Sequence, residues 1–175
     1  MRRLLLTIAV TVVAAWVVSG ASSASPVHVT GGGTGTFAAD LDPGIDPDID
    51  GSHFGLGAVF RGGTARGHFE CLMAGNADIL GLPLMAVEGK VTGGSADAVT
   101  GTATLTGTAT VNLANGVTFR GVQYRVLLWA GGPGAAHLQL TVLGAFDGVP
   151  GDAVAGNGNY DLPVETVTSG QITVH

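Results

Sequence analysis

The sequence predicts an all-β fold, built as a single antiparallel β-barrel or β-sandwich of about eight strands after an N-terminal signal peptide. From residue 52 onward, apolar and polar residues alternate with a period of two in most segments. Glycine- and proline-rich segments separate these runs, and no window repeats with the period of a helix. A closed barrel and a pair of packed sheets would both cover the strand edges, so both architectures fit the pattern.

The N-terminal segment has the features of a secretory signal peptide. Arg2 and Arg3 precede an apolar run at residues 4–18, and the small residues that follow offer cleavage after Ala21 or Ala24. The apolar run is shorter than the roughly 20 residues of a membrane-spanning helix. We therefore expect a cleaved signal peptide, with an uncleaved anchor as the alternative.

These features divide the chain into a signal peptide, residues 1–24, and a single all-β domain, residues 25–175. We expect the domain to be secreted or otherwise extracytoplasmic, with no transmembrane segment after signal cleavage. With 46% hydrophobic and 11% charged residues, the composition is that of a folded domain with its own core. Because 13 acidic residues outnumber 7 basic ones, a nucleic-acid partner is excluded. Nothing in the composition indicates another partner or an oligomeric state.

Cys71 is the single cysteine of the chain, so an internal disulfide is excluded. It shares the parity of Phe69 and Met73, which places it on the buried face of a strand. This position predicts an inert core thiol; a reactive or intermolecular thiol is the alternative.

The predicted strands each have one apolar face. These faces are Phe54, Leu56, Ala58 and Phe60; Phe69, Cys71 and Met73; Leu138, Leu140, Val142 and Phe146; and, in a closing strand, Ile172 and Val174.

A threonine occupies every second position from Thr100 to Thr110. The alternating run at residues 99–112 is longer than an ordinary strand of about 5 or 6 residues, which predicts a bend or bulge at Gly107. Threonine is a good strand former on a wet face. The alternatives are a flat binding face for a periodic surface such as ice or a polysaccharide, and a polar barrel interior.

Two local signals follow this run. Asn115-Gly116 between two alternating runs predicts a hairpin, because both residues of its tight turn need positive φ. The apolar residues then move from an odd-numbered position, Phe119, to even-numbered ones, Val122 and Tyr124. This change of phase predicts a β-bulge at Gly121. Alternating strands also occur in outer-membrane barrels, but 6% aromatic residues are few for the aromatic girdles of that class.

An acidic segment carries the clearest metal-binding spacing. Five aspartates lie within eleven residues: Asp40, Asp42, Asp46, Asp48 and Asp50. Asp46, Asp48 and Asp50, followed by Gly51, have the D-x-D-x-D-G spacing of a calcium loop. The twelfth position is Gly57 instead of the glutamate of an EF-hand. The segment therefore predicts either a non-helical calcium site, with calcium as the cofactor, or a solvated acidic loop.

Histidines supply the remaining candidate sites. His68 and Glu70 share one strand face, and His53 on the preceding strand would complete a two-histidine, one-carboxylate metal set. An ordinary polar pair on the outside of the sheet is the alternative. His28 and His175 would meet if the first and last strands pair, and we expect both on the surface.

Short motifs along the mature chain also carry a family resemblance. They are residues 27–33 (VHVTGGG), 35–37 (GTF), 66–69 (RGHF), 147–152 (DGVPGD) and 170–175 (GQITVH). Together they resemble a group of uncharacterised secreted bacterial β-modules, which begin with a valine and glycine-triplet segment and end in a glycine, isoleucine, valine, histidine strand. The resemblance implies an all-β extracytoplasmic domain and no particular activity. The acidic insertion after Phe37 departs from that pattern.

The sequence contains none of the G-x-S-x-G, H-E-x-x-H or C-x-x-C motifs. We therefore expect a non-catalytic module that binds or acts structurally at the cell surface or in the medium, and no catalytic residue is named. The alternative is a barrel enzyme or small-ligand carrier with a polar pocket lined by Tyr124, Arg125, His68 and Glu70. An adhesive protein that associates through an open strand edge is a third class.

Overall fold

The computed structural model describes residues 25–38, 51–79, 82–113, 116–149 and 151–175. The predicted signal peptide, residues 1–24, lies outside these residues. Within them, no helix has the length and apolar character needed to cross a membrane. The strands of the described part are β1 (Val27–Thr36), β2 (Gly51–Arg61), β3 (Thr64–Ile79), β4 (Leu82–Asp97), β5 (Thr102–Leu113), β6 (Thr118–Trp129), β7 (His137–Leu143), β8 (Tyr160–Asp161) and β9 (Glu165–Val174).

These strands close into a ring. The order along the sheet is β6, β5, β4, β3, β2, β1, β9, β7, and β6 also pairs with β7. Each pairing is antiparallel, and the two-residue strand β8 pairs with β7 beside the ring. The all-β prediction is confirmed, and the closure selects a barrel of eight strands over two separate sheets.

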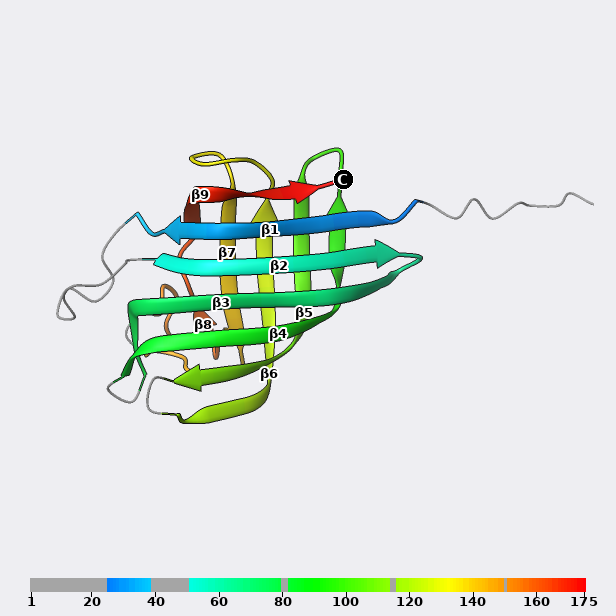
Figure 1. Cartoon of the computed structure of the whole chain (residues 1–175). Helices are drawn as coiled ribbons and strands as arrows, with labels where there is room; N and C mark the ends of the chain where they lie inside the picture. Colours follow the sequence, from blue (N-terminus) through cyan, green and yellow to red (C-terminus); the bar gives the residue numbers. More distant parts are fainter. Residues whose placement is uncertain (1–24, 39–50, 80–81, 114–115, 150) are drawn as a thin grey trace, which may run out of the picture.

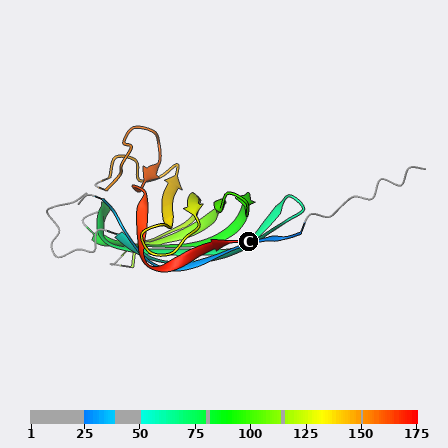
Figure 2. The ribbon, with the colours of Figure 1, turned by 90° about the horizontal axis from the view of Figure 1, so that it is seen from above.

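The barrel is flattened into two layers. In Figure 1, β1, β2 and β3 run across the front, while β7 and the last part of β6 run nearly perpendicular to them behind. Figure 2 shows the connection between β7 and β9, in orange, on the side away from β1 and β2. Long strands that bend are therefore needed to pass from one layer to the other.

Bulges lie on these long strands. In the β5–β6 ladder Ala109 pairs with Val122 and Thr110 with Arg120, so Gly121 is the extra residue, with φ of 71°. The predicted bulge at Gly121 is confirmed. The structure also has an irregularity next to Gly107, as predicted. Its extra residue, however, belongs to the partner strand β4, between Val91 and Gly93.

The predicted hairpin is also confirmed, since β5 and β6 are antiparallel neighbours on either side of it. The Leu113 N–H donates to the carbonyl of Val117 at 2.9 Å, and the Gly116 N–H donates to that of Leu113 at 2.9 Å. Asn115 itself lies outside the described residues.

The predicted apolar faces point into the barrel. All their members are buried except Phe60, Phe146 and Val174, which are partly buried against the core. On β5, Leu105 and Val111 face the interior and the threonines lie on the outer side, so a polar interior lined by threonine is excluded. The strand begins at Thr102 and not at Val99, because Val99 is 96% exposed in a turn where its N–H binds Asp97.

Candidate functional site

A buried carboxyl group lies inside the barrel, on β9. Ile172 points inward from an even-numbered position, whereas Glu165 and Val167 point inward from odd-numbered positions. The alternation of inward and outward side chains therefore changes phase within β9. The change occurs at Thr168, because Thr34 of β1 pairs with Ser169 while Gly35 pairs with Val167, which leaves Thr168 as the extra residue of a bulge. Bulges re-aim the side chains that follow them. This bulge therefore turns Glu165 into the interior, where its exposed fraction is 0%.

Three residues on three adjacent strands make up this buried carboxyl site: Glu165 on β9, Gly35 on β1 and Ser52 on β2. The Ser52 hydroxyl donates to Oε2 of Glu165 at 2.6 Å. The Glu165 side chain reaches Ser52 across Gly35, where an added Cβ would collide with Oε2. Oε1 of Glu165 has no hydrogen-bond partner among the described residues. Burial raises the pKa of Glu165 to about 7, against the opposing effect of the hydrogen bonds from the Ser52 hydroxyl and N–H.

Cys71 on β3 lies next to this site. Burial raises the pKa of its thiol far above the ordinary value, and the nearby Glu165 carboxylate raises it further, while a hydrogen bond with Ser52 acts in the opposite direction. A thiol in such surroundings stays protonated and is a poor nucleophile. Its burial, at 2% exposure, agrees with the predicted core position.

Tyr124 on β6 is the other buried side chain with an unpartnered polar atom in the described residues. Its ring stacks on Phe69 with centroids 5.7 Å apart. Burial raises the pKa of its hydroxyl to about 12. The four residues proposed for a polar pocket are therefore separated, since Tyr124 is inside the barrel while Arg125, His68 and Glu70 lie on its outer side.

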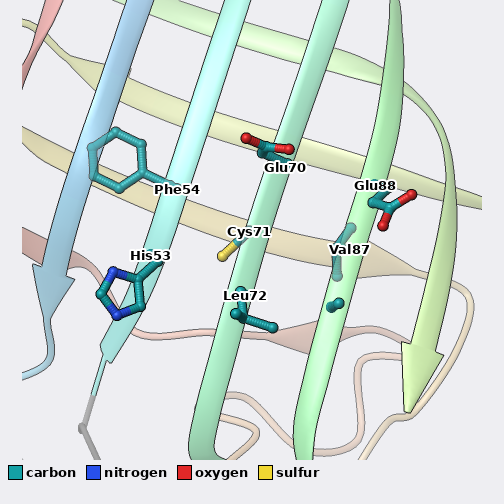
Figure 3. Close-up of a pocket in the computed structure, with 8 residues that line it drawn as sticks. His53, Phe54, Glu70, Cys71, Leu72, Val87 and Glu88 are labelled. Atoms are coloured by element: carbon teal, nitrogen blue, oxygen red, sulfur yellow. The ribbon is translucent and has the colours of Figure 1, made fainter. Parts of the chain in front are cut away.

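A shallow hollow on the outer side of the barrel contains several of the predicted site residues. Figure 3 shows His53 on β2, Glu70 and Leu72 on β3, and Glu88 on β4 around it. Glu70 and Glu88 are direct cross-strand partners, and like charges in that arrangement repel each other. Leu72 is 40% exposed, so the hollow combines negative charge with an apolar side chain.

The predicted metal set of His53, His68 and Glu70 does not form. His53 pairs with Leu72 and His68 with Gly57, which separates the two histidines by four positions along the ladder, about 13 Å. In the part of the chain that the structure describes, no group of three or more His, Cys, Asp or Glu side chains is placed to hold a metal ion. His68 and Glu70 instead cover Gly57 and Gly55 on the neighbouring strand, as outer-face polar residues.

The predicted calcium ligands Asp46, Asp48 and Asp50 lie outside the described residues. Three other aspartates organise the connection between β7 and β9. Asp147 accepts the N–H groups of Gly156 and Gly158, and Asp152 accepts those of Gly148, Val154 and Asp161. Asp161 accepts the Thr141 hydroxyl at 2.8 Å and the Asn157 amide at 2.6 Å. These bonds occupy the carboxylate oxygens with donors from the connection itself and from Thr141 of β7.

His28 and His175 meet as expected, because β1 and β9 pair. Their backbones exchange hydrogen bonds of 2.6 and 2.9 Å, and their rings stack with centroids 5.7 Å apart. Both side chains are exposed, which agrees with the predicted surface position.

The chain matches no known protein-family model, no curated protein and no solved structure. What its residues do is therefore inferred from their own chemistry.

Neither Glu165 nor Ser52 is among the site residues predicted from the sequence. The signal for Glu165 was a change of parity between Val167 and Ile172, of the same kind that located the bulge at Gly121. Ser52 carried no comparable signal, because its partner lies 113 residues away.

Proposed function

We propose that this chain is a secreted, non-catalytic β-barrel module that acts as a binding or structural element at the cell surface or in the medium. The observation that carries the proposal is the filling of the barrel. Its described interior is packed with large apolar side chains, among them Phe69, Met73, Met85, Leu105 and Leu140. Carriers and enzymes of barrel shape need an interior or mouth with room for a ligand and with convergent polar groups. A filled barrel favours contacts through its outer face and loops.

The closed ring supports a module that does not assemble through its strand edges. Each of the eight ring strands has a neighbour on both sides in the described part of the chain. Because open edges are the usual template for adding strands from another molecule, closure disfavours the adhesive, edge-pairing class.

The alternative is a small-ligand carrier or enzyme with a polar pocket. The observation that favours it is the buried carboxyl site, with Cys71 beside it and Tyr124 elsewhere in the same interior. Unpartnered buried polar atoms are uncommon and call for an explanation.

Expression of the full chain in a bacterial host tests export. The proposal expects the chain in the medium or on the cell surface, starting at Ser22 or Ser25 after signal cleavage. An intact N-terminus on cytoplasmic chain would contradict it.

Uptake of an apolar dye tests the second part of the proposal. Anilinonaphthalene sulfonate becomes fluorescent in apolar cavities, and a filled barrel leaves its emission unchanged. A β-barrel carrier with an open apolar cavity serves as the positive control. Saturable enhancement by the native chain would favour the carrier over the non-catalytic module.

A further inference from the structure

Ionisation of Glu165 in the buried carboxyl site destabilises the closed barrel. A buried carboxylate needs partners for both oxygens, and here Ser52 serves Oε2 while Oε1 has none among the described residues. The neutral acid removes most of this cost, because it carries no charge into the interior. The two protonation states of Glu165 therefore differ strongly in how well they fit the closed barrel.

Several local features act together to place the acid there. The bulge at Thr168 turns Glu165 inward, Gly35 leaves room for its side chain, and Ser52 supplies the donor. An alanine at position 35 or an unbulged β9 would each remove this arrangement. The site is therefore a built feature of the fold, formed by the first, second and last strands of the ring.

The other titratable groups around the site do not compensate a charge on Glu165. Cys71 on β3 is a titratable neighbour whose pKa the Glu165 carboxylate raises, and that thiol stays neutral. On β7, Leu138 is the cross-strand partner of Glu165. His137 is the partner of the next residue, Thr166, and its Nδ1 lies 3.3 Å from the Thr166 hydroxyl. Thr166 and Glu165 point to opposite sides of β9, so His137 does not face the carboxyl group. Gly35 and Ser52 contribute no charge from β1 and β2. Within the described residues, no cation faces the carboxyl group.

We propose that Glu165 is a pH-sensitive lock for the start of β9: the neutral acid holds this segment against β2 across β1, and ionisation loosens it. The segment that opens includes Val167, whose N–H donates to the carbonyl of Ala136 at 2.9 Å and whose carbonyl accepts the Gly134 N–H at 2.8 Å. The raised pKa of Glu165, about 7, places the change between acidic and neutral conditions. This inference does not rest on the proposed secretion or binding function.

The sign of the effect follows from linkage. Closed chain keeps the proton on Glu165 at pH values where opened chain has released it, so opening becomes more favourable as pH rises. The opening equilibrium should rise by up to about tenfold per pH unit between the ordinary value and the raised pKa of Glu165, and then level off.

Native-state hydrogen exchange of the Val167 amide tests this, after correction for the intrinsic effect of pH on exchange. The wild-type opening equilibrium should rise with pH, whereas Glu165→Gln should give a flat profile. Glu70→Gln, which changes an exposed glutamate on the outer face, is the matched control and should behave as wild type. Identical pH profiles for wild type and Glu165→Gln would overturn the proposal.

A measurement on the wild-type chain covers the case in which Glu165→Gln fails to fold. The carboxyl carbon of Glu165, followed by NMR, should titrate near neutral pH and not in the ordinary glutamate range. Ser52→Ala should move that midpoint upward, because the Ser52 hydroxyl stabilises the carboxylate. Titration in the ordinary range, or a midpoint unmoved by Ser52→Ala, would rule the lock out.

Discussion

The ring of Tyr124 on β6 lies over Gly89 on β4, two strands away in the barrel wall. A Cβ added at Gly89 would lie 2.5 Å from a carbon of that ring, and one added at Gly107, on the intervening strand, would lie 3.3 Å from it. The two glycines leave the space that the ring fills. Position 89 must therefore be glycine for the Tyr124 ring to pack where it does.

Gly89→Ala should therefore destabilise the barrel by about 1–3 kcal/mol, because a methyl group would force the Tyr124 ring and the wall apart. Thermal or chemical denaturation measures the loss. Gly32→Ala is the matched control, since its added Cβ would meet only the Phe54 carbonyl oxygen at 3.5 Å, an ordinary contact. Equal losses in the two variants would show that the ring does not set the cost.

Tyr124→Phe should leave the free energy of unfolding unchanged or raise it by up to about 1 kcal/mol, because the hydroxyl is buried without a partner in the described residues. Thr141→Val makes the contrast, since its buried hydroxyl donates to Asp161 and its loss should cost about 1–3 kcal/mol. Urea denaturation of both variants compares them directly. A clear loss of unfolding free energy in Tyr124→Phe would mean that the Tyr124 hydroxyl makes a stabilising hydrogen bond.

Asp152→Asn should loosen the connection between β7 and β9. The amide replaces one oxygen that accepts backbone N–H groups, at a cost of about 1–2 kcal/mol in urea denaturation. Glu88→Gln, at an exposed position on β4, should have little effect.

Asp152 also predicts a pH dependence. Burial acts to raise the pKa of Asp152, but hydrogen bonds from Gly148, Val154 and Asp161 outweigh it and lower that pKa. Its contribution to stability is therefore present above the pKa of the unfolded chain and is lost as pH falls through the lower folded value. The difference in stability between wild type and Asp152→Asn should shrink in acid. A difference that stays constant with pH would contradict this role.

Calcium decides between the two interpretations of the D-x-D-x-D-G segment. The calcium site predicts a higher melting temperature in excess calcium than in EDTA, with a gain of about 2.7 kcal/mol at a hundred times the dissociation constant. Replacing Asp46, Asp48 and Asp50 together by asparagine should abolish the difference. Identical melts in calcium and EDTA would favour the solvated acidic loop.

The sequence by itself determined the local features of this protein. Alternation assigned the buried faces of β2, β3 and β7, because the side chains of a strand point to opposite sides whatever its neighbours are. The parity change after Phe119 located the bulge at Gly121, and the glycine there has the positive φ that the position requires.

Only the tertiary structure decided the closure of the ring and the contents of its interior polar site. The pairings of β1 with β9 and of β6 with β7 depend on long-range register. Register also brings Ser52 and Glu165 together across Gly35, and it places Gly89 under Tyr124. A period of two predicts which side of a strand is buried, but it carries no information on which strand lies opposite. For that reason the core residues were predictable, whereas the partners of Glu165 and Tyr124 were not.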